Sequence, residues 1–227
     1  MFSENPVQAI IFDMDGVLCD SEPFICEAAI RMLAEDYGVT AVAADFAPFV
    51  GMGENRFIGG VAEKHGAEIE IESAKARTYA LYLELIRGRL QPLPGVHAFI
   101  EQARARGWKL AVASSADDVK VTGNLAEIGL PPSVFDAVVN GLDVERRKPA
   151  PDIFNLAAEL IGVDPCRAVV VEDAPAGVEA AVAAGAYPLG ITSSFAAEKL
   201  QAVGARWIAA DLAEAMSLMP LWAGERP

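Results

Sequence analysis

The sequence has few cysteines and few histidines, and both shortages exclude classes of protein. The three cysteines, Cys19, Cys26 and Cys166, are odd in number and lack CxxC spacing, which argues against a disulfide framework and a zinc site. The two histidines, His65 and His97, fall in expected helices with no second histidine four residues away, so the helical zinc pattern is absent. We expect buried or half-buried thiols and histidines with ordinary structural or surface roles.

Basic residues are also scarce, at 18 against 32 acidic residues, and the formal net charge is −14. Such a chain repels nucleic acid and anionic membranes, because phosphate backbones are bound by clustered Lys and Arg. The first residues, MFSENPVQ, lack a basic segment followed by an apolar one, and Glu172, Asp173 and Glu179 interrupt the apolar stretch 168–191. We therefore expect neither a leader nor a membrane span. The composition predicts a cytoplasmic protein with no nucleic-acid or membrane partner. A small anionic ligand is still compatible, because local donors and a bound cation can outweigh a diffuse acidic surface.

Two common nucleotide and hydrolase motifs are missing as well. Neither GxxxxGK[ST] nor GxSxG occurs, which argues against a P-loop NTPase and against a serine hydrolase of the common type. What the chain does contain is hydrophobic residues, at 53% of its 227 residues. That share is enough for a substantial core in one or two domains.

From about residue 95 onward, helical patterns alternate with short apolar runs rich in Val, Ile and Ala. These runs are WKLAVAS, FDAVVNG, RAVVVED and YPLGIT. Apolar runs without polar alternation, each separated by a helix, are typical of a parallel sheet covered on both faces. We therefore predict an α/β fold with a doubly wound parallel sheet.

A segment with helical patterns and no convincing strand lies between the first apolar run, VQAIIF, and that series. Pro and Gly interrupt the helical period at DSEP and QPLPG, where the chain could hinge. We predict an α/β core domain of residues 1–20 and 93–227 and an inserted all-helical domain of residues 21–92. The aromatic residues Phe46, Phe49 and Phe57 are expected in the core of the helical domain rather than in a substrate pocket.

Polar residues follow three of the expected strands. They are Asp13 and Asp15 after the first strand, Ser114 and Ser115 after LAVA, and Glu172 and Asp173 after AVVV. Ligands of parallel α/β sheets bind beyond the carboxyl ends of the strands, so these groups converge on one crevice if the strands are neighbours. Crowded carboxylates repel one another unless a cation or a proton neutralises them. A set of carboxylates without His or Cys suits Mg²⁺ rather than zinc.

A lysine beside such a set can hold an anion, and Lys148 lies in RRKPAPD, just before an expected helix. Phosphate fits best, because Mg²⁺, Lys, a hydroxyl and backbone N–H groups can share its oxygens during in-line attack. One aspartate can be the nucleophile that forms an aspartyl-phosphate. The other can protonate the leaving oxygen and then activate water. A calcium loop is disfavoured, because Val17 and Leu18 stand where that loop needs Asp or Asn and then Gly.

Four segments together resemble the motifs of the haloacid dehalogenase superfamily, in its beta-phosphoglucomutase-like branch: DMDGVLCDSE, VASSA, RKPAPDIF and VVEDAPAGVEAA. The resemblance covers nearly the whole chain and implies a Rossmann-like core whose inserted helical cap acts as a lid. It implies that Asp13 is the nucleophile and Asp15 the general acid and base. It further implies the following sites: Ser114 and Lys148 for the phosphoryl group; Asp13, the main-chain carbonyl of Asp15, Asp173 and an assisting Glu172 for Mg²⁺; and Ser115, Glu54, Asn55 and Arg56 for the substrate.

Members of this superfamily catalyse different reactions, and departures from their patterns narrow the choice. Dehalogenases lack the second aspartate, and phosphonatases replace it with Ala and carry a cap lysine. Phosphomutases usually have His, Arg and a Ser-Lys-Asn continuation where this chain has Ile25, Glu54 and Ala116, Asp117 and Asp118. Acidic residues at these positions repel the second phosphate that a mutase must hold. Arg56, Lys75, Arg77 and Lys120 could nevertheless replace the missing basic residues.

We therefore predict a Mg²⁺-dependent phosphatase of small phosphate monoesters, such as sugar or polyol phosphates, that works through an aspartyl-phosphate. The partner is a small phosphorylated metabolite. A phosphomutase of the beta-phosphoglucomutase type is the first alternative. A catalytically silent member that binds a phosphorylated ligand or a protein is the second, and it predicts the loss of a motif residue, whereas all four motifs are intact.

Overall fold

The computed structural model describes residues 6–49 and 53–224. A six-stranded parallel sheet forms its centre, in the order β3-β2-β1-β4-β5-β6. The strands are β1 (Ala9–Phe12), β2 (Lys109–Ala113), β3 (Ala137–Val139), β4 (Ala168–Glu172), β5 (Tyr187–Ile191) and β6 (Trp207–Ala209). The predicted doubly wound α/β fold is confirmed.

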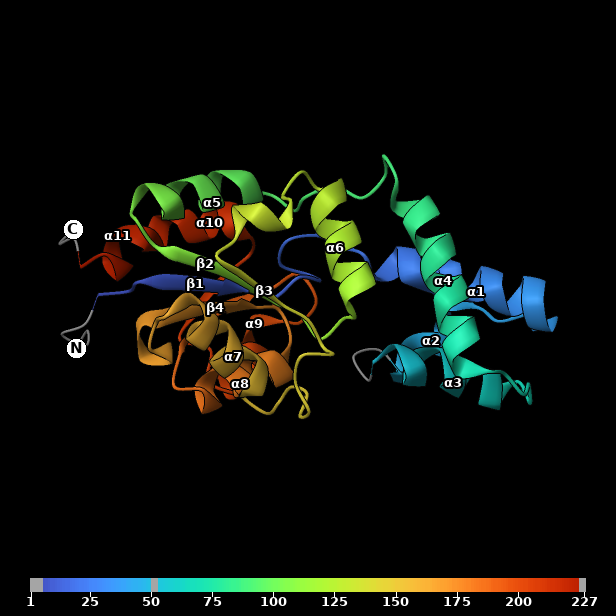
Figure 1. Ribbon diagram of the computed structural model, residues 1–227. Coiled ribbons are helices and arrows are strands. Elements are labelled where there is room, and N and C mark those ends of the chain that lie inside the picture. The colour runs from blue at the N-terminus through green and yellow to red at the C-terminus, as the bar shows by residue number, and fades with distance from the viewer. Residues whose placement is uncertain (1–5, 50–52, 225–227) are drawn as a thin grey trace.

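Helices cover both faces of the sheet, with α5 and α10 on one side and α7 and α8 on the other (Figure 1). The helices of this part are α5 (Val96–Ala105), α6 (Asp118–Glu127), α7 (Asp152–Ile161), α8 (Pro175–Ala183), α9 (Ala197–Ala202), α10 (Leu212–Ala215) and α11 (Met219–Trp222), with 3₁₀ turns at Pro132–Val134, Pro165–Arg167 and Met216–Leu218. Successive strand side chains point to opposite faces. Thus Ile10 and Phe12 of β1 pack in one core cluster, and Ala9 and Ile11 pack in the other. Burial on both faces explains why the strands read as unbroken apolar runs.

The segment between β1 and α5 is helical and lies beyond one end of the sheet (Figure 1). Its elements are α1 (Glu22–Tyr37), α2 (Ala43–Phe46), a 3₁₀ turn (Ala47–Phe49), α3 (Glu54–Lys64) and α4 (Ile71–Ile86). The two chain segments that join it to the sheet run side by side. The N–H of Leu93 donates to the carbonyl of Leu18 at 3.0 Å, and Cys19 and Pro92 form an isolated antiparallel β-bridge. Helix α2 has four residues, too few for a helical period to show in the sequence.

The residues expected to have structural roles are placed as follows. The rings of Phe46 and Phe57 pack with their centroids 4.7 Å apart, and both side chains are buried. Nε2 of His65 lies 2.9 Å from a carboxylate oxygen of Asp45, and His97 is exposed. The three cysteines are free. Burial was the wrong expectation for Cys166, because it lies in a 3₁₀ turn at the surface.

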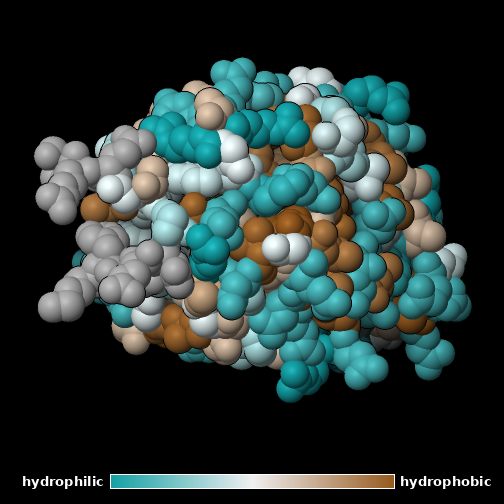
Figure 2. Space-filling model, turned by 60° about the vertical axis from the view of Figure 1, so that its left-hand side comes forward, coloured by the Kyte–Doolittle hydropathy of each residue, from teal (hydrophilic) through white to brown (hydrophobic). Residues whose placement is uncertain are grey.

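Hydrophilic side chains surround a smaller hydrophobic area on the face drawn in Figure 2. Six large hydrophobic side chains of the described residues are more than a third exposed: Val42, Val119, Leu142, Leu160, Val182 and Phe195. Most of the large hydrophobic side chains of the described residues are therefore at least partly buried. Within residues 6–49 and 53–224, no helix combines the length and apolarity needed to span a membrane.

Candidate active site

The sheet order brings the three polar strand ends together. Strand β1 lies between β2 and β4, and Phe12 is in register with Val112 on one side and Val171 on the other. The residues that follow these positions therefore leave the sheet at the same edge. At this edge the N–H of Asp13 donates to the carbonyl of Val171 at 2.9 Å, which fixes the first aspartate against β4.

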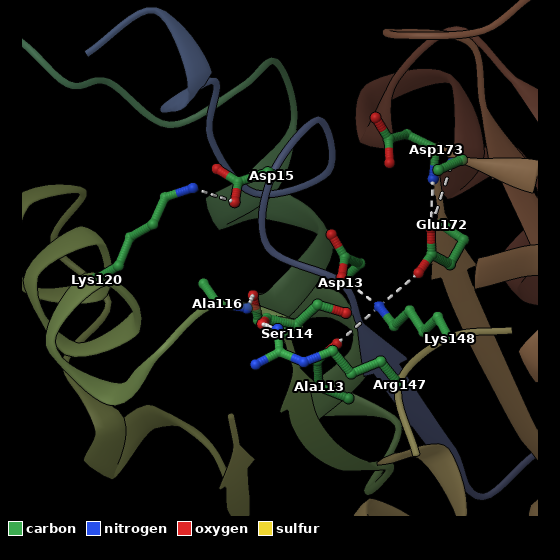
Figure 3. A network of polar contacts seen from close by, with 12 residues as sticks. Asp13, Asp15, Ala113, Ser114, Ala116, Lys120, Arg147, Lys148, Glu172 and Asp173 are labelled. Atoms are coloured by element: carbon green, nitrogen blue, oxygen red, sulfur yellow. Dashed lines mark hydrogen bonds and ion pairs between the residues drawn. The ribbon is translucent and has the colours of Figure 1, made fainter. Parts of the chain in front are cut away.

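Lys148 joins two carboxylates at this edge (Figure 3). Its Nζ lies 2.5 Å from Oδ1 of Asp13 and 2.6 Å from Oε1 of Glu172, and it also donates to the carbonyl of Ala113 at 3.1 Å. Burial lowers the pKa of Lys148, but the two carboxylates outweigh that effect, so the pKa lies above its ordinary value. Burial raises the pKa of Asp13 well above its usual range, against the opposing charge of Lys148. The lysine is thus a fixed cation beside Asp13.

Asp13, Glu172 and Asp173 form a cluster in which one carboxylate oxygen from each residue lies within 4.8 Å of the others. Burial and the neighbouring Glu172 raise the pKa of Asp173 to about 7. The second oxygen of Glu172 accepts from the N–H of Asp173 at 3.1 Å and from the N–H of Ala174 at 3.3 Å. Crowded carboxylates, with the pKa values of Asp13 and Asp173 raised, fit a hard divalent cation, which relieves their repulsion. Because both oxygens of Glu172 already have partners, Asp13 and Asp173 are the better placed ligands.

Asp15 lies in a different environment from Asp13. Its carboxylate accepts a hydrogen bond from the hydroxyl of Ser21 and pairs with Nζ of Lys120 at 2.8 Å. Lys120 is 3% exposed, and its pKa is raised because the charges of Asp15 and Glu22 outweigh burial. Asp15 therefore faces Lys120 while Asp13 faces Lys148 (Figure 3). The side chain of Asp15 is not part of the three-carboxylate cluster.

A cavity of about 310 Å³ opens over these residues. Eight of the residues proposed from the sequence line it: Asp13, Asp15, Glu54, Ser114, Ser115, Lys148, Glu172 and Asp173. Ser114 is buried, and its hydroxyl accepts from the N–H of Ala116 at 3.2 Å. The strand ends thus supply one wall of the cavity, and the helical segment supplies Glu54.

Asn55 and Arg56 are not among the described residues that line the cavity. Asn55 donates to Glu72 at 3.4 Å, and Arg56 pairs with Glu63 at 2.8 Å. Each helical residue points about 100° away from the one before it, so the two residues after Glu54 in α3 are directed elsewhere. We therefore no longer expect these two side chains to contact the substrate in this arrangement.

Some of the aromatic residues, and one of the cations considered as replacements for the mutase residues, also line the cavity, and others do not. Phe49 and Phe57 line the cavity, so the expectation that they serve only as core was too narrow. Lys75 pairs with Asp117 and Glu72, and Arg77 pairs with Glu35 at 2.9 Å; neither cation lines the cavity among the described residues. Lys120 does line it.

Sequence reasoning missed part of the cavity wall. Arg147 lines the cavity, and its Nη1 donates to the carbonyl of Ser115 at 3.0 Å. Ser194 and Phe195 also line it, and the hydroxyl of Ser193 donates to the carbonyl of Gly16 at 2.5 Å. The signal was available, because TSSF follows β5 as a further polar strand end, next to β4 in the sheet.

Comparisons with known proteins agree with this geometry. A family model described as haloacid dehalogenase-like hydrolase matches residues 7–185. The chain is 40% identical over 209 residues to Protein SUPPRESSOR OF QUENCHING 1, chloroplastic, of Arabidopsis thaliana, a match that covers 91% of this chain and only 20% of that longer protein. It is 34% identical to a phosphorylated carbohydrates phosphatase of Thermotoga maritima, covering 79% of this chain and 82% of the relative. A solved structure of a putative beta-phosphoglucomutase from Thermotoga maritima superposes with a TM-score of 0.79 at 31% identity, covering 95% of this chain and 99% of that one.

Proposed function

The chain belongs to the haloacid dehalogenase-like hydrolase family, and we propose that, as a phosphoric monoester hydrolase of that family, it hydrolyses small phosphate monoesters through a phosphorylated Asp13. Sugar and polyol phosphates are the proposed substrates. The contact between Lys148 and Asp13 carries the proposal. It places a buried cation beside a buried carboxylate at the floor of a cavity, where a phosphoryl group needs both a nucleophile and a countercharge.

In the proposed first step, a carboxylate oxygen of Asp13 attacks phosphorus and the bond to the leaving oxygen breaks. Lys148 and the hydroxyl of Ser114 hold the oxygens of the transferring group. Asp15 gives its proton to the leaving oxygen, which departs as an alcohol. Since Asp15 faces Lys120 in this structure, its carboxyl must turn toward Asp13 for this step.

In the second step, Asp15 takes a proton from water, and the resulting oxygen nucleophile attacks the phosphorus of the aspartyl-phosphate. Inorganic phosphate leaves, and the Asp13 carboxylate is regenerated. We propose that Asp13, Asp173 and the main-chain carbonyl of Asp15 hold Mg²⁺, with Glu172 acting mainly as the anchor of Lys148. When bound, the ion supplies positive charge that offsets the negative charge of the phosphoryl oxygens.

We further propose that residues 21–92 form a separate domain that closes over the cavity as a lid. Two features support this proposal: the helices lie beyond the end of the sheet, and the two connections to it are adjacent at Leu18 and Leu93. Two neighbouring connections can serve as a hinge. The cytoplasmic location and the absence of nucleic-acid and membrane partners stay predictions from the composition.

A phosphomutase is the competing function, since two similar structures bear that name. Ile25 and Glu54 both line the cavity, so the positions where mutases usually carry His and Arg hold an apolar and an acidic side chain. Neither can hold a second phosphate. This observation favours hydrolysis over phosphoryl transfer back to the product.

The test is to incubate the purified protein and Mg²⁺ with a panel of sugar and polyol phosphates, measuring inorganic phosphate. β-Glucose 1-phosphate with a trace of its bisphosphate is run in parallel, measuring glucose 6-phosphate. We expect free phosphate from some panel members, lost on chelation of Mg²⁺ and restored by its addition. Glucose 6-phosphate formed without free phosphate would show a mutase instead. A protein that binds these compounds and turns over none would be the catalytically silent alternative.

A further inference from the structure

The cavity has two chemically different ends. One end holds Lys148, from the loop between β3 and α7, and the three-carboxylate cluster proposed to hold Mg²⁺. Besides Asp15, three further acidic side chains line the cavity: Asp20, just before α1, Glu22, the first residue of α1, and Glu54, the first residue of α3. Apolar side chains of Ile25, Phe49 and Phe57 lie among them. The phosphoryl group belongs at the first end, so the leaving group must occupy the second.

The two cations that line the cavity outside the strand-end cluster are already engaged. Lys120 pairs with Asp15 at 2.8 Å and with Glu22 at 3.5 Å, so two carboxylates share one ammonium group. Arg147 is held by the carbonyl of Ser115. A second anionic group on a substrate would therefore have to compete with Asp15 and Glu22 for Lys120, or with a backbone carbonyl for Arg147.

Glu54 brings to this cavity a buried carboxylate oxygen, Oε2, that has no hydrogen-bond partner among the described residues. As the first residue of α3, Glu54 also occupies the positive end of that helix, where a substrate anion would otherwise find its best site. In a cavity of 310 Å³ the leaving group stays within a Debye length, about 10 Å, of this carboxylate.

We propose that Glu54 makes the cavity select phosphate monoesters whose leaving group carries no second anionic group, such as polyol monophosphates, and reject phosphorylated carboxylates and bisphosphates. Glu54 acts by repelling the extra charge, while a hydroxyl group can approach the same carboxylate as a donor. This inference rests on the proposed phosphatase function and names its substrate class.

The test uses two substrates that differ at one carbon, glycerol 3-phosphate and 3-phosphoglycerate, in which a carboxylate replaces the CH₂OH group. At pH 8 and low ionic strength, we expect kcat/KM of the wild type to favour glycerol 3-phosphate by about 30-fold or more. Glu54→Gln keeps the size of the side chain and removes its charge. We expect it to shrink this preference by about 10-fold, mainly through a lower KM for 3-phosphoglycerate.

Glu63→Gln is the matched control, because Glu63 lies on the same helix, is exposed and pairs with Arg56. It should leave the preference unchanged. Asp20→Asn, at an exposed residue that lines the cavity, is a second variant that lowers the negative charge if Glu54→Gln fails to fold, and it should shrink the preference in the same direction. Equal use of both substrates by the wild type would overturn the inference and leave the phosphatase function standing. So would a preference that folded Glu54→Gln leaves unchanged or, if that variant does not fold, one that Asp20→Asn leaves unchanged. No hydrolysis of either substrate or of p-nitrophenyl phosphate would overturn both.

Discussion

The ammonium group of Lys148 lies 2.5 Å from a carboxylate oxygen of Asp13, so the proposed nucleophile is paired with a cation in the protein itself. The same ammonium group pairs with Glu172 at 2.6 Å, and the side chain of Lys148 is only 9% exposed. One lysine therefore separates two buried carboxylates that would otherwise repel each other. This arrangement gives Lys148 a part in stability as well as in the proposed chemistry.

Lys148→Met should lower both stability and activity. Without the ammonium group, the buried carboxyls of Asp13 and Glu172 lose the cation and hydrogen-bond donor that they share, so we expect the free energy of unfolding to fall by about 3 kcal/mol. Phosphatase kcat/KM should fall by about 10³-fold, since a fixed charge on the phosphoryl group is lost. Urea denaturation and phosphate release measure the two effects. Lys109→Met, which removes an exposed lysine paired with Asp136, is the control and should change either quantity little. Full activity of Lys148→Met would contradict the role proposed for this residue.

Asp13→Asn should abolish turnover and spare the fold. The amide cannot form an acyl phosphate, so we expect kcat to fall by at least about 10⁴-fold. Lys148 keeps Glu172 as its partner, and we expect the free energy of unfolding to change by no more than about 1 kcal/mol. Mass spectrometry of acid-quenched protein should find the phosphorylated peptide only in the wild type. Activity of Asp13→Asn near that of the wild type would show that the nucleophile is another residue.

The stability of the metal-free protein should fall as the pH rises from about 5 to about 7. Burial raises the pKa of Asp173 to about 7 from an ordinary value of 3.8, and the pKa of Asp13 is also raised. The folded state therefore binds protons that the unfolded state has already released in this range, so the free energy of unfolding declines until both carboxyls are ionised. Urea denaturation at several pH values in EDTA measures the decline.

Two further measurements, one with Mg²⁺ and one with Asp173→Asn, test whether the decline in stability comes from these carboxyl groups rather than from other titrating groups. Saturating Mg²⁺ should remove the decline, because the cation stabilises the ionised carboxylates of the folded state. Asp173→Asn should make the decline in EDTA shallower, because its amide does not titrate. If the difference between wild type and variant stayed constant with pH, the raised pKa of Asp173 would be refuted.

Gly16→Ala should damage the site, and Gly38→Ala should not. Both glycines have a positive φ, 75° and 66°, so both changes carry a similar backbone cost of about 1 to 2 kcal/mol. A Cβ atom on residue 16 would lie 1.9 Å from Oδ2 of Asp173, whereas one on residue 38 meets no heavy atom within 4 Å. We expect Gly16→Ala to lose at least about 10-fold in activity by displacing Asp173, and Gly38→Ala to keep full activity. Comparable activity in the two variants would mean that Asp173 moves without consequence.

The parallel sheet and the composition of the proposed site were predictable from the sequence. Unbroken apolar runs such as AVVV require burial on both faces, and Asp13, Ser114 and Asp173 each follow such a run. The carboxyl ends of parallel strands lie at one edge, so the sequence predicted that these groups meet if their strands are neighbours, and the sheet order makes them neighbours. The family motifs added the expected roles of these residues.

The helical side of the cavity was not predictable to the same degree. Lys120 stands in a helix that reads as an ordinary amphipathic segment, and only the packing of α6 against the helical segment brings its ammonium group to Asp15. Which residue of Glu54, Asn55 and Arg56 faces the cavity depends on the rotation of α3, which no short motif specifies.

The sequence thus determined the parallel strands, their polar ends and the chemistry that these ends can perform, because these follow from local patterns of burial and from parallel strand geometry. Tertiary structure decided which cation meets which carboxylate: Lys148 with Asp13, and Lys120 with Asp15. Each of these pairs joins residues more than a hundred positions apart, and only the packing of separate elements brings their charged atoms within 3 Å.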